Sequence, residues 1–171
     1  MKSFKPLSIH VIRDHVLLGA IIAAALSPSL GAWGAFLFWL GTVFVDTDHY
    51  LRFLLVGKFR NFRIKSMFSF FEHSFQSRNH PDFLALDIFH TVEFLALLSL
   101  VTVYVAPAFL PVLYGVLFHM TTDFFHLLRH KALSKRAHSV LEYYIRKKRM
   151  KARGGRPEVL NAAIFDHASS Q

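Results

Sequence analysis

The chain has 171 residues, of which 53% are hydrophobic and 15% aromatic, and its mean hydropathy is +0.35. This apolar content exceeds that of ordinary soluble domains and favours an integral membrane protein. The formal net charge is +9, and the absence of cysteine excludes disulfide bonds and thiolate metal sites. Any bound metal must therefore use imidazole and carboxylate ligands.

Lysine and arginine are confined to residues 1–13, 52–78 and 129–156, and the stretches between these regions predict the membrane-spanning part. In chain order, the apolar runs predict four helical spans. These cover about residues 9–26, 32–51, 83–105 and 111–128. Turn-forming residues separate the two spans of each pair. We therefore expect an all-α integral membrane four-helix bundle built from two helical hairpins.

The distribution of positive charge predicts the orientation. Both expected hairpin turns lack Lys and Arg, so the positive-inside rule places both termini in the cytoplasm. We expect the chain to lie in the inner (cytoplasmic) membrane. Basic and aromatic residues alternate over 58–73, which indicates an interfacial segment. We expect a cytoplasmic helix over 132–152, which completes a single helical membrane domain over 1–153, and a flexible tail over 154–171.

Histidines and carboxylates recur within the predicted spans, where ionisable groups are costly and usually functional. At about 1.5 Å of rise per helical residue, those on different spans fall at one level near the cytoplasmic face. Antiparallel helices can bring such groups into one metal site. The candidate metal ligands are His15, Asp46, Asp48, His49, His90, His119, Asp123 and His126.

The strongest local signal is on the fourth predicted span. His119, Asp123 and His126 are spaced i, i+4 and i+7 and share one helical face. Carboxylates buried near imidazoles, with no Lys or Arg in the same apolar stretches, would carry unbalanced charge. A bound divalent cation would balance this negative charge. We expect zinc, with manganese or iron as alternatives.

Other carboxylates have candidate roles in the chemistry. His90 and Glu93 are neighbours at i, i+3, and Glu93 is the candidate general base. Asp48 is an alternative base if it is not a metal ligand. Asp87 could orient a metal-binding imidazole by hydrogen bonding.

The segment Asp46-Thr47-Asp48-His49, the early His15 and the late His119-Met120-Thr121-Thr122-Asp123 resemble the membrane-bound metal-dependent hydrolase family. The resemblance covers about residues 10–130 and extends more distantly to zinc-dependent phospholipase C enzymes. It implies a small helical membrane protein with a divalent-metal site. The site residues that it implies are His15, Asp46, Asp48, His49, His90, His119 and Asp123.

The chain departs from the family pattern near the third span. Where the family has a histidine and arginine followed by Thr-His-Ser, this sequence has Glu72-His73-Ser74 and, further on, Phe89-His90-Thr91. The resemblance alone leaves the choice between His73 and His90 open. The predicted depth in the membrane favours His90.

These observations favour a metal-dependent hydrolase that attacks phosphoesters or lipid phosphates with metal-activated water. The alternatives are a non-enzymatic divalent metal carrier or transporter, and a membrane scaffold with a structural metal. The expected partners are membrane lipids, including anionic headgroups near the basic run Arg146–Lys151. No nucleic-acid partner is expected, because no base-reading motif is visible.

Overall fold

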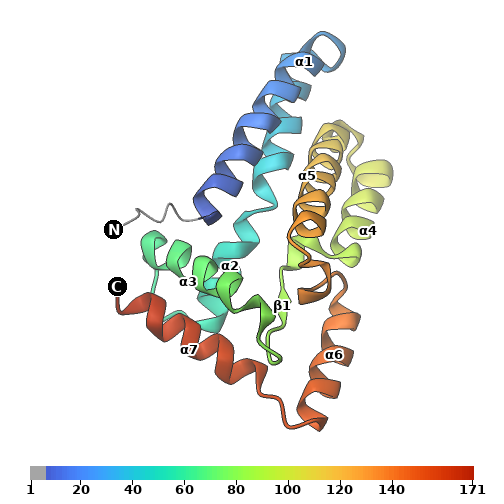
Figure 1. Ribbon diagram of the computed structural model, residues 1–171. Helices are drawn as coiled ribbons and strands as arrows, with labels where there is room; N and C mark the ends of the chain where they lie inside the picture. Colours follow the sequence, from blue (N-terminus) through green and yellow to red (C-terminus); the bar gives the residue numbers. More distant parts are fainter. Residues whose placement is uncertain (1–6) are drawn as a thin grey trace. The chain divides into compact units, whose positions relative to one another are not determined.

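The computed structural model describes the backbone of residues 7–171 and the side chains of residues 15–171. The described chain is predominantly helical (Figure 1). Its contacts divide it into two compact units. The apolar unit contains Val11–Thr47 and Phe89–Leu133. The basic unit contains Asp48–Ile88 and Ser134–Gln171, together with residues 7–10. The sequence-based expectation of one domain over 1–153 does not anticipate this division.

The apolar unit is built from three helices. These are α1 (Leu7–Phe44), α4 (Val92–Leu100), which continues as a π-helical turn over Val101–Val105, and α5 (Leu110–Arg129). Helix α1 is interrupted at Gly31, whose φ of 69° lies in the left-handed region that glycine adopts most easily. Its two halves lie side by side, since the Trp39 indole donates a hydrogen bond to the Val16 carbonyl at 3.3 Å.

Two glycines bring α5 close to the second half of α1. A Cβ atom at Gly115 would overlap the Phe38 carbonyl oxygen, and one at Gly41 would overlap the Val112 carbonyl oxygen. Only a residue without a side chain allows the backbones to approach this closely. The contact fixes α5, which carries the candidate ligands His119, Asp123 and His126, against the helix that precedes Asp46.

Within the part of the chain that the structure describes, two helical segments are long and apolar enough to cross a membrane, His15–Val56 and Pro107–Arg129. Val92–Val105 is a shorter apolar helix. The helix within the predicted third span, 83–105, begins only at Val92, because Thr91 caps it by accepting a hydrogen bond from the Phe94 amide at 3.3 Å. A short strand and a 3₁₀ turn occupy the residues before the cap.

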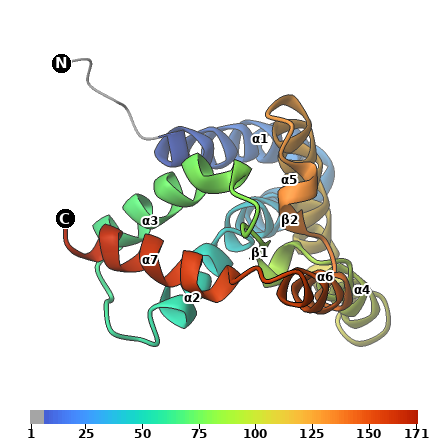
Figure 2. The same ribbon diagram turned by 60° about the horizontal axis from the view of Figure 1, so that its bottom comes forward.

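The basic unit combines short helices with a two-stranded parallel sheet. Its elements are α2 (Thr47–Val56), α3 (Ile64–Gln76), β1 (Ala85–Leu86), β2 (Arg136–Ala137), α6 (Val140–Ala152) and α7 (Pro157–Ser169). Strand β1 pairs with β2, with Ala85 opposite Arg136. Helices α3 and α7 lie side by side in both views (Figures 1 and 2), and Phe53, Phe70 and Phe165 form the core of this unit.

The expected interfacial segment, 58–73, is divided between a loop and a helix. Lys58 and Phe59 have positive φ angles of 50° and 57°, so the chain turns there before α3 begins at Ile64. The expected cytoplasmic helix, 132–152, begins only at Val140. Ser139 starts it as an N-cap that accepts a hydrogen bond from the Glu142 amide.

The residues predicted as a flexible tail, 154–171, instead contain α7. Pro157 stands in the first turn, where its fixed φ favours helix initiation. Ile164, Phe165 and Ala168 are buried in the same cluster as Phe53. This apolar face is too short to be distinctive in a sequence that is otherwise polar.

The ion pairs between α6 and α7 predict that part of the protein's stability depends on pH. The Glu158 carboxylate lies 2.6 Å from Lys151 Nζ and 3.0 Å from Lys147 Nζ. The hydrogen bond from Lys151 is the main cause that lowers the pKa of Glu158 from 4.5 to about 2. Because the folded-state pKa is lowered, the ionised form stabilises the fold fully above the unfolded-state pKa. This contribution is lost as the pH falls through the folded-state pKa.

We expect the Glu158 carboxyl carbon to titrate in NMR spectra with a midpoint near 2. Lys151→Gln should raise this midpoint toward 4.5, and added salt should do so partly, because the pair is exposed to solvent. A Glu158 midpoint near 4.5 in the wild-type chain would show that the ion pair does not form.

Candidate metal centre

Five ionisable side chains of the apolar unit face one another. They come from the first half of α1, the turn after α1, the 3₁₀ turn before α4, and α5. The members of this ring are His15, Asp46, His90, His119 and Asp123. Four of the five residues are buried, and the Asp46 side chain is only 12% exposed. The site thus consists of three imidazoles and two carboxylates shielded from solvent.

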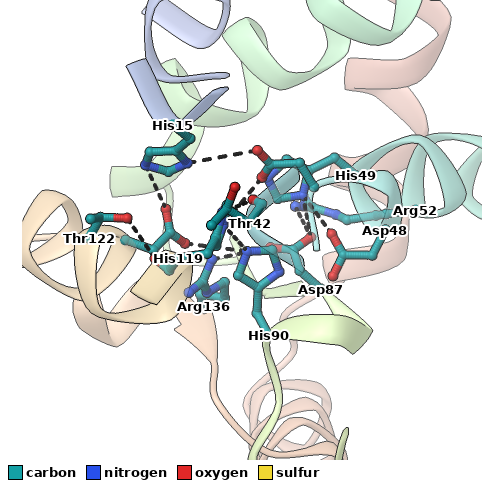
Figure 3. A network of polar contacts seen from close by, with 12 residues as sticks. His15, Thr42, Asp48, His49, Arg52, Asp87, His90, His119, Thr122 and Arg136 are labelled. Atoms are coloured by element: carbon teal, nitrogen blue, oxygen red, sulfur yellow. Dashed lines mark hydrogen bonds and ion pairs between the residues drawn. The ribbon is translucent and has the colours of Figure 1, made fainter. Parts of the chain in front are cut away.

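The contacts form a closed circuit (Figure 3). Asp46 lies between two rings, with carboxylate oxygens 3.7 Å from His15 Nδ1 and 3.5 Å from His119 Nε2. Asp123 lies between two others, 3.5 Å from His90 Nε2 and 4.0 Å from His15 Nε2. The circuit closes where the Nε2 atoms of His90 and His119 approach to 3.2 Å.

These spacings match ligands around an ion better than direct hydrogen bonds. The four imidazole–carboxylate distances, 3.5 to 4.0 Å, exceed the usual hydrogen-bond range. Ligands about 2.1 Å from a tetrahedral ion are separated from one another by about 3.4 Å. The distances around the ring lie close to this value. The buried His/Asp cluster could therefore hold a metal ion.

The Thr42 carbonyl determines which ring nitrogen of His119 is available to bind a metal ion. His119 Nδ1 lies 2.7 Å from the Thr42 carbonyl oxygen, which can only accept a hydrogen bond. In the neutral ring, Nδ1 therefore carries the proton and the lone pair is on Nε2, which faces the other ring members. A backbone carbonyl that fixes the tautomer in this way is typical of metal-binding histidines.

His119 can bind only one metal ion at a time. Two groups of three possible ligands contain it, one with His15 and Asp46 and the other with His90 and Asp123. A single Nε2 lone pair binds one ion. The two groups are therefore alternatives for one ion, or they jointly surround it. With neutral imidazoles the ring carries two negative charges, which one divalent cation would balance.

The basic unit contains a second group, Asp48, His49 and Asp87. His49 Nδ1 lies 3.1 Å from Asp48 and 3.6 Å from Asp87. Asp87 also contacts Arg52 at 3.4 Å and Arg136 at 4.0 Å (Figure 3). The guanidinium groups of Arg52 and Arg136 lie beside the Asp87 carboxylate and stabilise its negative charge. Two arginines already balance the two carboxylates here, so this group requires no cation.

The two remaining sequence candidates lie outside these groups. His126 is half-buried, and its ring centre lies 4.5 Å from that of His130. Glu93 is exposed in the first turn of α4. Among the described side chains, neither belongs to a set whose ligand atoms lie close enough together to hold an ion.

Three residues that contact the candidate ligands cannot be recognised from the sequence alone. Arg52 and Arg136 are read from the sequence only as positive charges that orient the chain, because their partner Asp87 is distant in sequence. The Thr42 carbonyl cannot be found from residue types, because every residue has a carbonyl group.

Comparison with known proteins identifies no relative of this chain. No protein-family model, curated protein or solved structure matches this chain. The resemblance to membrane-bound metal-dependent hydrolases therefore rests on the motif residues alone. The geometry of the ring becomes the main support for any functional proposal.

Proposed function

We propose that this protein is an integral membrane hydrolase that uses one divalent metal ion to cleave phosphoesters or lipid phosphates. Its apolar helices cross the inner membrane as a four-helix bundle of two hairpins, with both termini in the cytoplasm. The charge distribution supports this orientation, since Lys and Arg are absent from both hairpin turns. Its partners are membrane lipids, including anionic headgroups.

The single observation that carries the proposal is the closed ring of three imidazoles and two carboxylates. Their spacing suits a bound ion, and their residue types suit zinc, with manganese or iron as alternatives. His119 supports it further, because its Nδ1 contact with Thr42 leaves Nε2 ready to bind the ion. The Asp48, His49 and Asp87 group is a weaker candidate because arginines balance its charge.

A bound divalent ion would lower the pKa of a coordinated water and polarise the phosphoryl oxygen. The protein would have to accept the proton of that water. We propose that a ring member that does not bind the ion accepts this proton; the 3.2 Å distance between His90 Nε2 and His119 Nε2 supports His90 in this role. Glu93 is the second candidate base, three residues after His90 at the start of α4.

The test is a screen of the purified chain, in lipid nanodiscs, against phosphomonoesters, phosphodiesters and lipid phosphates. We expect hydrolysis that stops with a chelator and returns with zinc. Asp123→Asn should reduce the rate by roughly a thousandfold, because stabilisation by the ion is worth several kcal/mol. Glu93→Gln should reduce the rate without removing the metal only if Glu93 is the base.

The near-complete burial of His90 and His119 favours a second candidate, a structural ion that holds the helices together. A structural site is closed, whereas a catalytic one keeps a position open for water. Tightly bound metal without hydrolysis of any substrate, together with a large loss of thermal stability on chelation, would favour the structural role over the enzyme.

A further inference from the structure

An open cleft of about 470 Å³ lies in the basic unit, between the loop that precedes α3 and the carboxyl-terminal end of α7. This volume is within the range of small-ligand sites. Its lining combines side chains of both charges with an amide, a hydroxyl and an aromatic ring. These residues are Arg60, Asn61, Arg63, Phe165, Asp166 and Ser169.

Asn61 joins the two walls of the cleft. Its Oδ1 accepts a hydrogen bond from the Arg63 amide at 2.8 Å, which fixes the loop. Its Nδ2 donates to Ser169 Oγ at 3.0 Å, which attaches the loop to the end of α7. Because Ser169 Oγ is the acceptor in this contact, its own proton can be donated to another group. These hydrogen bonds give the cleft its shape without a ligand.

Arg60 is held on one wall of the cleft and is still accessible. Its Nε donates to the Gly57 carbonyl at 3.0 Å, and its Nη2 lies 3.3 Å from an Asp166 carboxylate oxygen. The guanidinium also lies over the Phe165 ring, 5.4 Å from its centre. The Arg60 and Asp166 side chains are nevertheless 60% and 64% exposed, so a group that enters the cleft can contact both. Arg63, which lines the same cleft, is exposed as well.

The charges of the cleft define the class of ligand. Its two guanidinium groups favour a phosphate, which they can bind through charge-assisted hydrogen bonds. The Asp166 carboxylate and the partial negative charge at the carboxyl end of α7 oppose a purely anionic ligand and favour a cation beside the phosphate. A primary ammonium group has three donors and no acceptor, which suits a carboxylate. A phosphoethanolamine group carries both charges.

The loop beside the cleft also presents apolar side chains to its surroundings. Lys58 and Phe59 both have positive φ angles, which residues with side chains rarely adopt, and the chain turns sharply after α2. Phe59, Phe62 and Ile64 are each more than half exposed. Exposed apolar residues that alternate with basic ones are typical of segments at a membrane surface, where the basic groups reach lipid headgroups.

We infer that this cleft binds the phosphoethanolamine headgroup of a membrane lipid. Arg60 and Arg63 bind the phosphate, and Asp166 binds the ammonium group. The exposed Phe62 lies in the acyl boundary beside the headgroup. The inference rests on the membrane location in the proposed function, but it requires neither the metal ion nor hydrolysis.

The test is native mass spectrometry of the full chain in an uncharged detergent, titrated with dioleoyl phosphatidylethanolamine and, separately, dioleoyl phosphatidylcholine. We expect the ethanolamine lipid to bind more tightly, because the choline ammonium has no hydrogen to donate. Arg63→Gln should weaken binding of both lipids about three- to tenfold, the effect of losing one charge-assisted contact at an exposed site.

Lys65→Gln is the matched control for Arg63→Gln. It removes the same charge at a neighbouring exposed position that does not line the cleft. We expect its lipid affinities to change by less than about twofold, because an exposed charge outside the cleft is largely screened.

Two further variants test the ammonium contact and the source of the headgroup. Asp166→Asn should remove the preference for the ethanolamine lipid over the choline lipid, since the substituted amide is neutral. Phe62→Ser should weaken binding of both lipids. It should leave binding of soluble phosphoethanolamine, measured by phosphorus NMR, unchanged.

Three results would overturn the inference. Equal weakening by Arg63→Gln and Lys65→Gln would mean that only the overall charge attracts the lipid. An unchanged lipid preference in Asp166→Asn would mean that the ammonium group binds elsewhere. Unchanged lipid affinity in Phe62→Ser would mean that the occupant is free phosphoethanolamine. Hydrolysis of a lipid would appear in the same spectra as a change of mass, so failure of the cleft and failure of the proposed enzyme are distinguishable.

Discussion

Replacing His119 with alanine should remove the metal from the purified protein. Both groups of possible ligands in the apolar unit contain His119, so this one change disrupts either arrangement. Changes to residues that merely orient ligands already weaken metal binding about 10- to 100-fold, and the loss of a direct ligand should exceed this. The measurement is the metal content of the variant by elemental analysis, beside its helical content by circular dichroism.

Three further variants make this result specific. His126→Gln removes a histidine from the same helix and should leave the metal content unchanged, although the sequence alone predicts His126 as a ligand. His15→Ala and His90→Ala each break one group, so the variant that loses more metal identifies which group binds the ion. Metal retained in a folded His119→Ala variant would exclude the ring as the binding site.

Replacing Gly115 with valine should separate α5 from the second half of α1. A side chain at this position meets the backbone of Phe38 and Thr42, which cannot move aside as a flexible side chain can. Overpacking typically costs about 1–3 kcal/mol, and a clash with backbone should lie at or above the upper end. Because Thr42 also positions His119, we expect the variant to lose both thermal stability and metal.

Gly34→Ala is the matched control for this prediction. Gly34 is also helical and in the apolar unit, but a Cβ there would meet only side-chain atoms, the nearest being Leu30 Cβ at 3.0 Å. We expect a much smaller change in its melting temperature and normal metal content. Equal stability of Gly115→Val and Gly34→Ala would contradict the close helix contact.

The sequence predicts the helical class and five residues that the apolar unit brings together. His119 and Asp123 are visible as a pair because i, i+4 spacing places them on one helical face. His15, Asp46 and His90 are also predicted, because apolar helices rarely contain ionisable residues without a function. These are signals of residue type and spacing, which a single sequence contains in full.

Other features depend on contacts between distant residues. The arginines that balance Asp87 come from α2 and β2, and no local pattern pairs residues 52, 87 and 136. The start of α4 depends on Thr91 acting as a cap, because an apolar run continues across the strand and turn before it. Helix α7 similarly depends on Phe165 reaching a core formed by residues of α2 and α3.

The metal content of the wild-type chain tests the central claim most directly. The protein would be purified without added metal and without chelator, and analysed by inductively coupled plasma mass spectrometry, with X-ray absorption to identify the ligands. The ring predicts one divalent ion per chain, bound by a mixture of nitrogen and oxygen atoms. A correctly folded chain that contains no metal, and takes up none when zinc, manganese or iron is supplied, would contradict it.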